Sequence, residues 1–196
     1  MELSREVNKL TIPFPTGVPV RGENLIGRKK EIGRIMHLGN LPEDDLKVYI
    51  KKKFGKLGCK IEQEAVEEII NKTNGHPYYS QLLCQVVYFS IKGEEGTITS
   101  SDVYKGFKQA IMSEKSYFDQ IWFDLTRAKH LLPLLRSIAR EEESPYKKKE
   151  LFNQNLYRSL FSLTTKGFIE KVSAGHYRIR DPFLKEYIKM KEEEKG

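Results

Sequence analysis

The segment LYRSLFSLTTKGFIEKVSAGHYRIRDPFLKEYI, residues 156–188, decides the fold of the C-terminal half of this chain. Its first part, Leu156–Phe168, repeats apolar residues at helical spacing. IEKVSAGHYRIR then alternates apolar and polar residues on both sides of Ala174-Gly175, which is typical of a small β-hairpin. Asp181-Pro182 ends the hairpin and begins a closing helix over PFLKEYIKMK. The segment therefore predicts a helix, a hairpin and a second helix.

Upstream of this segment the sequence predicts more helices. Two stretches, Tyr117–Leu125 and Ala128–Glu142, have helical periodicity and precede a break at Ser144-Pro145. KKKELF, residues 147–152, is a short helix candidate. Several helices followed by a hairpin is the element order of a winged helix-turn-helix. We predict that residues 113–196 form such a domain.

Residues 41–112 predict a separate helical subdomain. Pro42 and the acids after it favour a helix start, and apolar residues follow at helical spacing. A second helix is expected over Glu62–Thr73 and is stopped by Asn74-Gly75. A third begins near Pro77 and is apolar around much of its circumference, so we expect it at the centre of the bundle. A fourth follows a capping box formed by Thr99 and Asp102.

Residues 1–40 predict an extended arm with one short helix. Three prolines, Pro13, Pro15 and Pro19, prevent a regular helix early in the chain. A helix is expected from Arg28 through Met36, and a turn follows it. The complete prediction is a mainly α protein, with this arm, a lid-like helical bundle over 41–112 and a winged helix over 113–196.

The stretch GENLIGRKKEI, residues 22–32, has nearly the glycine spacing of a phosphate-binding P-loop. In a working P-loop a Ser or Thr after the lysine holds Mg²⁺, and a buried strand precedes the glycines. Here Gly27 is followed by Arg28 and Lys29, and no apolar strand comes before Gly22. We therefore expect no nucleotide hydrolysis by this stretch.

Three stretches resemble one known family. FPTGVPVRGENLIGRKKEIGRI, residues 14–35, is similar through Ile26, Gly27, Arg28, Glu31 and Ile32 to the N-terminal box of AAA+-type ATPases of the signal-transduction ATPase group. TNGHPYYSQLLC, residues 73–84, resembles the motif of the helical lid in that family, and residues 163–188 resemble its winged helix. The P-loop core of the family, a domain of roughly 150–200 residues, would lie between Met36 and Leu41, where this chain has only a turn.

The resemblance implies that a few residues lie on the adenine side of a nucleotide site. These are Ile26, Gly27, Arg28, His76 and Pro77. The alternative for Gly75-His76-Pro77 is purely structural, since this triplet also ends one helix and begins the next. Most binding energy for a triphosphate comes from the P-loop amides and the metal ion. We therefore expect no cofactor, with weak binding of ATP or ADP as the alternative.

The charge of the chain is compatible with a polyanionic partner such as nucleic acid, although a basic surface is often only a soluble one. The net charge is +7, and residues from Ser144 onward carry twelve Lys and Arg against seven Asp and Glu. The predicted helix over 156–168 offers few side chains for reading bases, chiefly Asn155 and Arg158, so we expect backbone-directed contact with double-stranded DNA. The predicted DNA-binding residues are Lys147, Lys148, Lys149, Asn155, Arg158, Lys171 and Arg178.

No residue pattern predicts catalysis or a metal site. Neither Cys59 nor Cys84 has a histidine partner, and His37 and His130 lack metal-ligand spacing. We expect both cysteines to be reduced, no signal peptide or membrane span, and a cytoplasmic location. Abundant Lys and Glu are typical of thermophiles. The sequence therefore predicts a non-enzymatic module that binds DNA or a protein. The alternatives are a nucleotide-binding protein and a homodimer that buries apolar surface.

Overall fold

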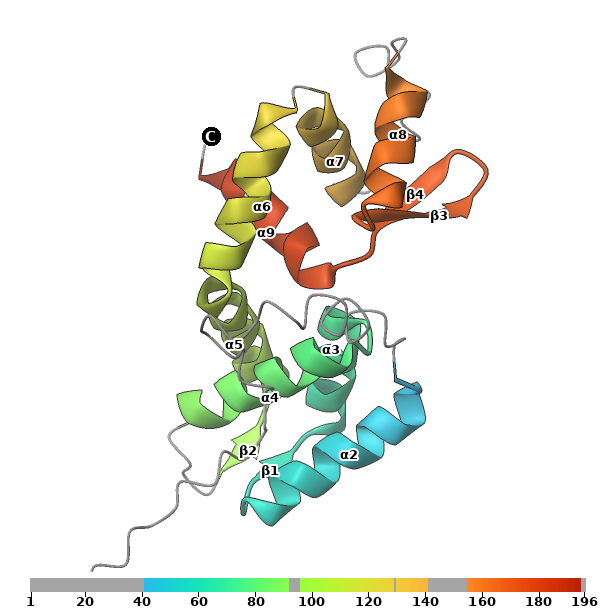
Figure 1. Ribbon diagram of the computed structural model, residues 1–196. Coiled ribbons are helices and arrows are strands. Elements are labelled where there is room, and N and C mark those ends of the chain that lie inside the picture. The colour runs from blue at the N-terminus through green and yellow to red at the C-terminus, as the bar shows by residue number, and fades with distance from the viewer. Residues whose placement is uncertain (1–40, 92–95, 129, 141–154, 195–196) are drawn as a thin grey trace, which may run out of the picture. The chain divides into compact units, whose positions relative to one another are not determined.

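The computed structural model describes residues 41–91, 96–128, 130–140 and 155–194 of the chain. Eight helices, α2 to α9, and two small two-stranded sheets account for most of these residues, which confirms the mainly α prediction (Figure 1). The chain divides into two compact units, residues 1–107 and 108–196. The predicted N-terminal arm, with its helix over 28–36, and the candidate helix over 147–152 lie outside the described residues.

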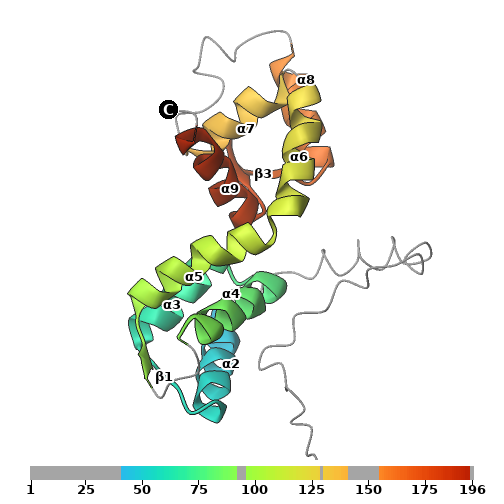
Figure 2. The same ribbon diagram turned by 90° about the vertical axis from the view of Figure 1, so that its left-hand side faces the viewer.

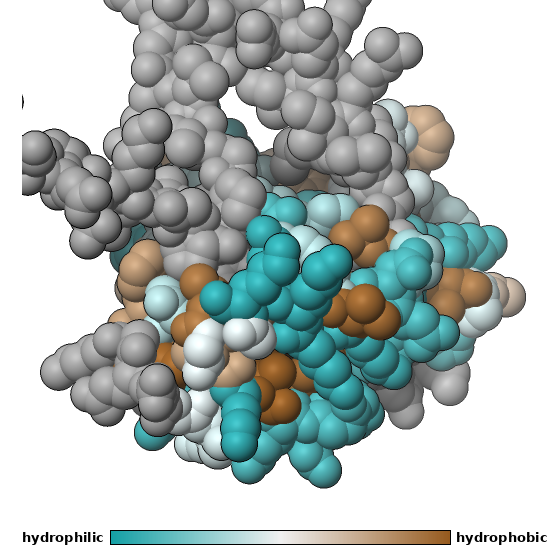
Figure 3. Space-filling model, turned by 90° about the horizontal axis from the view of Figure 1, so that it is seen from below, coloured by the Kyte–Doolittle hydropathy of each residue, from teal (hydrophilic) through white to brown (hydrophobic). Residues whose placement is uncertain are grey.

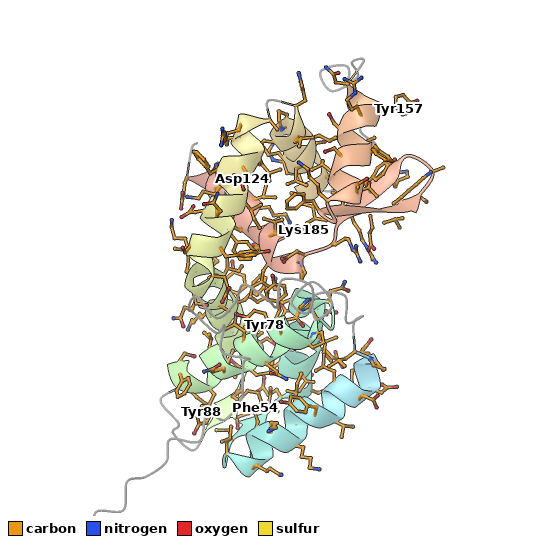
Figure 4. The ribbon with its side chains drawn as sticks, viewed as in Figure 1. Phe54, Tyr78, Tyr88, Asp124, Tyr157 and Lys185 are labelled. Atoms are coloured by element: carbon orange, nitrogen blue, oxygen red, sulfur yellow. The ribbon has the colours of Figure 1, made fainter. Side chains whose placement is uncertain are left out.

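The N-terminal unit begins with two amphipathic helices, α2 (Glu43–Lys56) and α3 (Gln63–Thr73). The buried side chains of α2 are Leu46, Ile50 and Phe54, which recur every four residues on one face; Figure 4 labels Phe54. Helix α3 buries Ala65, Val66, Ile69 and Ile70 against its neighbours. It ends as predicted, because Asn74 takes a left-handed conformation with φ of 49°.

Helix α4 (Pro77–Ser90) packs against α3 and α5 (Ser100–Ser113). A buried hydrogen bond joins Thr73 Oγ1 and Ser80 Oγ at 2.8 Å. Leu82, Leu83 and Val87 are buried as predicted, but Phe89 is 52% exposed. Phe89 lies two residues, or about 200° of rotation, beyond Val87, and so projects from the opposite face of the helix. The central position predicted for α4 therefore holds for Leu82, Leu83 and Val87 but does not extend to Phe89 in the last turn.

Two local features complete the N-terminal unit. Thr99 and Asp102 form the predicted capping box of α5: the Thr99 amide donates to Asp102 Oδ2 at 3.0 Å, and the Asp102 amide donates to Thr99 Oγ1 at 3.4 Å. Strands β1 (Lys60–Ile61) and β2 (Thr97–Ile98) form a parallel pair that the sequence did not predict. Two residues per strand are too few to produce a readable alternation of polar and apolar side chains.

The C-terminal unit opens with α6 (Lys115–Arg127) and α7 (Leu131–Ala139). Helix α6 is two residues longer at each end than predicted, and α7 begins three residues later than predicted. Figures 1 and 2 both place α9 (Pro182–Glu193) beside α7. Rings of α6 and α9 also meet, since Phe118 and Tyr187 are buried and stack with centroids 5.2 Å apart. These helices enclose the apolar core of the unit.

In chain order, α7 is followed by α8 (Leu156–Thr165) and by an antiparallel hairpin of β3 (Ile169–Ser173) and β4 (His176–Ile179), which precedes α9. Helix α8 stops three residues before the predicted end, because Gly167 adopts a φ of 78° that turns the chain into β3. The hairpin turns at Ala174-Gly175 as predicted, with Ile169 opposite Ile179. Asp181 caps α9 by accepting hydrogen bonds from the amides of Phe183 and Leu184, both at 2.9 Å.

Two further predictions concern cysteines and membranes. Cys59 and Cys84 are both buried free thiols, as expected, and burial raises the pKa of both. Over the described ranges, every helix is too short or too polar to cross a membrane.

Candidate nucleic-acid interface

Helix α8 has one buried face and one exposed face. Leu156, Leu160 and Leu163 pack into the core of the C-terminal unit, and this spacing directs the residues one position later toward solvent. Tyr157 and Phe161 are consequently 68% and 72% exposed. Figure 4 shows Tyr157 projecting from the first turn of α8, on the side away from α7. Two aromatic side chains one helical turn apart are thus largely exposed to solvent.

Basic side chains lie on this helix, at its end and on the strand that follows it. Arg158 lies on α8, Lys166 follows its last turn, and Lys171 lies on β3, against which α8 packs. All three are exposed, and within the described part of the chain their side chains form no ion pair. Their charges are therefore not neutralised by described neighbours, and each is able to contact an anion.

Arg178, another predicted DNA contact, has a partner within the hairpin. Its Nε donates to Oε1 of Glu170, the residue directly opposite on β3, and Arg180 Nε lies 3.8 Å from Glu170 Oε2. Side chains alternate between the two faces of a hairpin, so these three residues lie on the face opposite to buried Ile169. A phosphate at Arg178 would have to compete with this exposed ion pair, which contributes only about 0–1 kcal/mol.

The excess of positive charge is concentrated in this part of the unit. Residues 155–180, which form α8 and the hairpin, contain five basic residues and a single acidic residue, Glu170. The five basic residues are Arg158, Lys166, Lys171, Arg178 and Arg180. Because all five are exposed, the hairpin and the outer face of α8 carry a net positive potential.

Of the remaining predicted DNA-binding residues, the structure describes only Asn155. Lys147, Lys148 and Lys149 lie outside the described residues. Asn155 is half-buried at the start of α8, where its backbone carbonyl accepts the Ser159 amide at 2.8 Å. Its position at the helix start places it beside Tyr157 and Arg158 in sequence, at the end of the exposed face.

Of the residues predicted to lie on the adenine side of a nucleotide site, some are described by the structure and others are not. Ile26, Gly27 and Arg28 lie outside the described residues. His76 is the N-cap of α4, and its Nδ1 accepts a long 3.5 Å hydrogen bond from the Tyr79 amide, while Pro77 occupies the first helical turn. Gly75, with φ of 68°, links this cap to the end of α3. These contacts give Gly75-His76-Pro77 a capping role, and an adenine contact there stays a prediction.

Another concentration of charge, around Asp119 on α6, serves packing within the C-terminal unit. Asp119 accepts hydrogen bonds from Lys115 Nζ and from the hydroxyl of Tyr187, and Lys191 Nζ lies 3.6 Å from its Oδ1. The bonds from Lys115 and Tyr187 lower the pKa of Asp119 to about 2, and burial together with Asp119 raises the pKa of Tyr187. A surface depression beside Asp119 is lined by Met112, Ser113, Lys115, Ser116 and Gln120. Because the carboxylate of Asp119 already has Lys115, Tyr187 and Lys191 as partners, we interpret this cluster as structural.

The described residues could also carry a metal site or an apolar docking surface. No group of three or more His, Cys, Asp or Glu side chains there is arranged to hold a metal ion. One face of the N-terminal unit, seen in Figure 3, is mostly hydrophilic, with apolar residues in separate spots. This face therefore lacks the continuous apolar patch that a docking surface of the usual kind requires.

Comparison with known proteins gives one structural likeness. No protein-family model and no curated protein matches the chain. Among solved structures, a Walker-type ATPase of Pyrococcus abyssi matches with a TM-score of 0.59 and 18% sequence identity. The match covers 76% of this chain and 42% of that ATPase, so the chain spans less than half of its neighbour's length. The chain therefore has an ATPase-like fold.

Sequence reasoning overlooked Phe161 as a candidate contact. It is not among the predicted contacts, although the sequence carries a signal for it. Leu156, Leu160 and Leu163 already define one face at helical spacing, and Phe161 falls outside that face. An exposed aromatic ring of this kind is more informative about binding than a buried one.

Proposed function

We propose that this chain is a binding module whose C-terminal unit contacts double-stranded DNA, mainly through phosphates. The observation that carries the proposal is the five-to-one ratio of basic to acidic residues on α8 and the hairpin. Lys and Arg side chains bind phosphates and release counterions from DNA, which supplies affinity independent of sequence. Three of these cations, Arg158, Lys166 and Lys171, form no ion pair with described neighbours.

The order of elements supports a winged-helix mode of contact. In the C-terminal unit, α6 and α7 precede α8, and the β3–β4 hairpin follows it. In winged-helix proteins the helix before the hairpin and the hairpin itself are the parts that meet nucleic acid. The exposed face of α8 carries Arg158, Ser162, Thr164 and Thr165 as polar groups. Hydroxyls and one arginine suit phosphate contact better than the bidentate reading of several bases.

In this proposal the chain itself does not hydrolyse ATP. The stretch over 22–32 lacks the hydroxyl that holds Mg²⁺ in a P-loop. The ATPase-like fold is consistent with a chain that corresponds to part of a Walker-type ATPase and keeps a binding role. Purified protein with ATP and Mg²⁺ is expected to release no phosphate above the background without protein. Hydrolysis that follows the protein through purification would contradict this part of the proposal.

Titration of a fluorescent generic duplex with the full chain tests DNA binding. The variant Arg158→Gln/Lys166→Gln/Lys171→Gln is expected to weaken binding. If all three side chains contact phosphates, the slope of log K against log salt should fall by about 3. The matched control is Lys52→Gln/Lys56→Gln/Lys60→Gln, which removes the same charge from exposed positions of the N-terminal unit. This control should keep most of the affinity.

Two results would refute DNA binding by this surface. The first is an absence of binding by the unmodified chain at about 50 mM salt, where phosphate contacts are strong. The second is an equal loss of affinity in both triple variants, since that would show that only total charge matters. Near-ultraviolet circular dichroism of each variant establishes that the fold is intact.

A nucleotide is the second candidate ligand, favoured by the ATPase-like fold, with His76 as the predicted adenine contact. Adenine would stack or hydrogen-bond beside the half-buried imidazole. Calorimetry with ADP at millimolar concentration tests this candidate, and His76→Asn serves as the variant because asparagine still caps a helix. Heat that disappears in the variant supports it. An absence of heat with the unmodified chain rejects it.

A further inference from the structure

The outer face of α8 combines features that phosphate binding does not require. Tyr157 and Phe161 expose 68% and 72% of their surface on a helix whose other face is fully packed. Contact with a phosphate does not use an aromatic ring. A ring that stays in water also forgoes the stabilisation that burial of its apolar surface would give. The two rings therefore point to a partner with apolar, flat surfaces as well as negative charge.

We propose that this face binds nucleic acid with unpaired bases, which stack on Tyr157 and Phe161 while the basic residues hold the backbone. The proposal rests on the proposed function and names the preferred form of its ligand: duplex DNA that carries a single-stranded end or another stretch of unpaired bases. Base stacking on aromatic side chains combined with a basic groove is the general mode of single-strand binding without sequence preference. In an intact duplex the flat faces of the bases are covered by their neighbours and cannot reach the rings.

The spacing of the side chains fits such a strand. Four residues of helix rise about 6 Å, and stacked bases are separated by about 3.4 Å, so each ring has room for its own base. Arg158 lies between the two rings in sequence, and Lys166 at the end of α8 and Lys171 on β3 add positive charge nearby in the chain. Arginine is also able to stack on a base by cation–π contact. Backbone and bases of one strand are thus both accommodated.

Charge complementarity favours a nucleic acid over a second copy of the chain. A copy of this surface would bring the same unpaired cations, Arg158, Lys166 and Lys171, close to themselves across a symmetric contact. Like charges brought together at an interface oppose association.

The experiment compares three probes of equal length with the full chain: oligothymidylate, a blunt duplex, and an abasic strand that keeps the phosphates but lacks the bases. We expect oligothymidylate to bind at least about 5-fold more tightly than the abasic strand. Tyr157→Ala and Phe161→Ala should each weaken oligothymidylate binding about 5- to 150-fold, and should leave binding of the abasic strand unchanged. Tyr157→Phe keeps the ring and should keep the affinity.

Phe123→Ala is the matched control, because Phe123 is 57% exposed on α6, a different helix of the same unit. It should bind all three probes like the unmodified chain. Equal affinity for oligothymidylate and the abasic strand, with no effect of either alanine variant, would overturn the stacking proposal and leave phosphate binding intact. No binding to any probe at low salt would overturn both proposals. Dimerisation in light scattering that Phe161→Ala abolishes would instead assign the face to a second copy.

Discussion

Gly106 on α5 offers a direct test of how closely α4 and α5 pack in the N-terminal unit. A Cβ atom at position 106 would lie 2.6 Å from Val87 Cγ2, 3.5 Å from Val87 Cα and 3.6 Å from Val87 Cβ. Carbon atoms pack best at about 3.5–4.0 Å, so the first contact needs a movement of about 1 Å. Val87 is fully buried and β-branched, and its side chain has one strongly preferred rotamer in a helix. The helices themselves must therefore separate in Gly106→Ala.

The expected magnitude comes from two opposing effects. Alanine in place of glycine within a helix stabilises it by about 1 kcal/mol. Overpacking a well-packed core costs about 1–3 kcal/mol. Gly55, on α2, is the matched control because a Cβ there would meet nothing within 4 Å. Gly55→Ala should therefore raise the free energy of unfolding slightly, whereas Gly106→Ala should lower it by about 0–2 kcal/mol. The two variants should differ by about 1–3 kcal/mol.

Urea unfolding followed by circular dichroism measures this difference. A double variant, Gly106→Ala/Val87→Ala, separates the clash from other effects, because the smaller side chain leaves room for the new Cβ. The Gly106 substitution should cost less in the Val87→Ala background than in the original chain. The reasoning is refuted if Gly106→Ala is as stable as Gly55→Ala, or if the cost at Gly106 is the same in both backgrounds.

Three further predictions concern the C-terminal unit. Asp119→Asn should lower stability at neutral pH; the folded pKa of about 2 lies below the usual value near 3.9, so this carboxylate stabilises the fold above about pH 4. That contribution is lost as pH falls through 2. The free energies of unfolding of the unmodified chain and of Asp119→Asn, measured between pH 2 and 7, should therefore differ least at pH 2. Tyr187→Phe keeps the stack on Phe118 but removes the hydroxyl bonded to Asp119, so NMR titration should show a higher carboxyl pKa; an unchanged value would contradict the assigned cause. Asp181→Ala should cost about 0.5–2 kcal/mol in thermal unfolding by removing the cap of α9, whereas Asp181→Ser, which still accepts an amide, should cost less.

Much of the local structure was readable from the sequence because it depends on nearby residues. Asn74, the Thr99–Asp102 capping box and the cap at Asp181 each act within four residues, so their effect on the backbone is encoded locally. The β3–β4 hairpin was equally clear, since its turn residues and its alternation lie in one short segment. The parallel pair of β1 and β2 was not, because it joins residues 36 or more positions apart through only two residues each.

The candidate interface was predicted only in part. The sequence showed that the C-terminal segment is basic and that Arg158, Lys171 and Arg178 are candidates for DNA contact. It did not show that Arg178 pairs with Glu170, because this ion pair depends on the register of the hairpin. Phe161 was not predicted as a contact either, although the spacing of the three leucines already placed it off their face; only the packing of α8 shows that its own face is exposed.

The sequence by itself determined the helices, their caps, the hairpin and the positive charge of the C-terminal segment, because each of these follows from residues close together in the chain. The tertiary structure alone decided which apolar side chains are covered. Leu160 and Phe161 are neighbours in sequence and similar in hydrophobicity, yet one is 3% exposed and the other 72%. The difference arises because α8 presents only one face to the core of its unit, and burial is a property of that packing rather than of either residue.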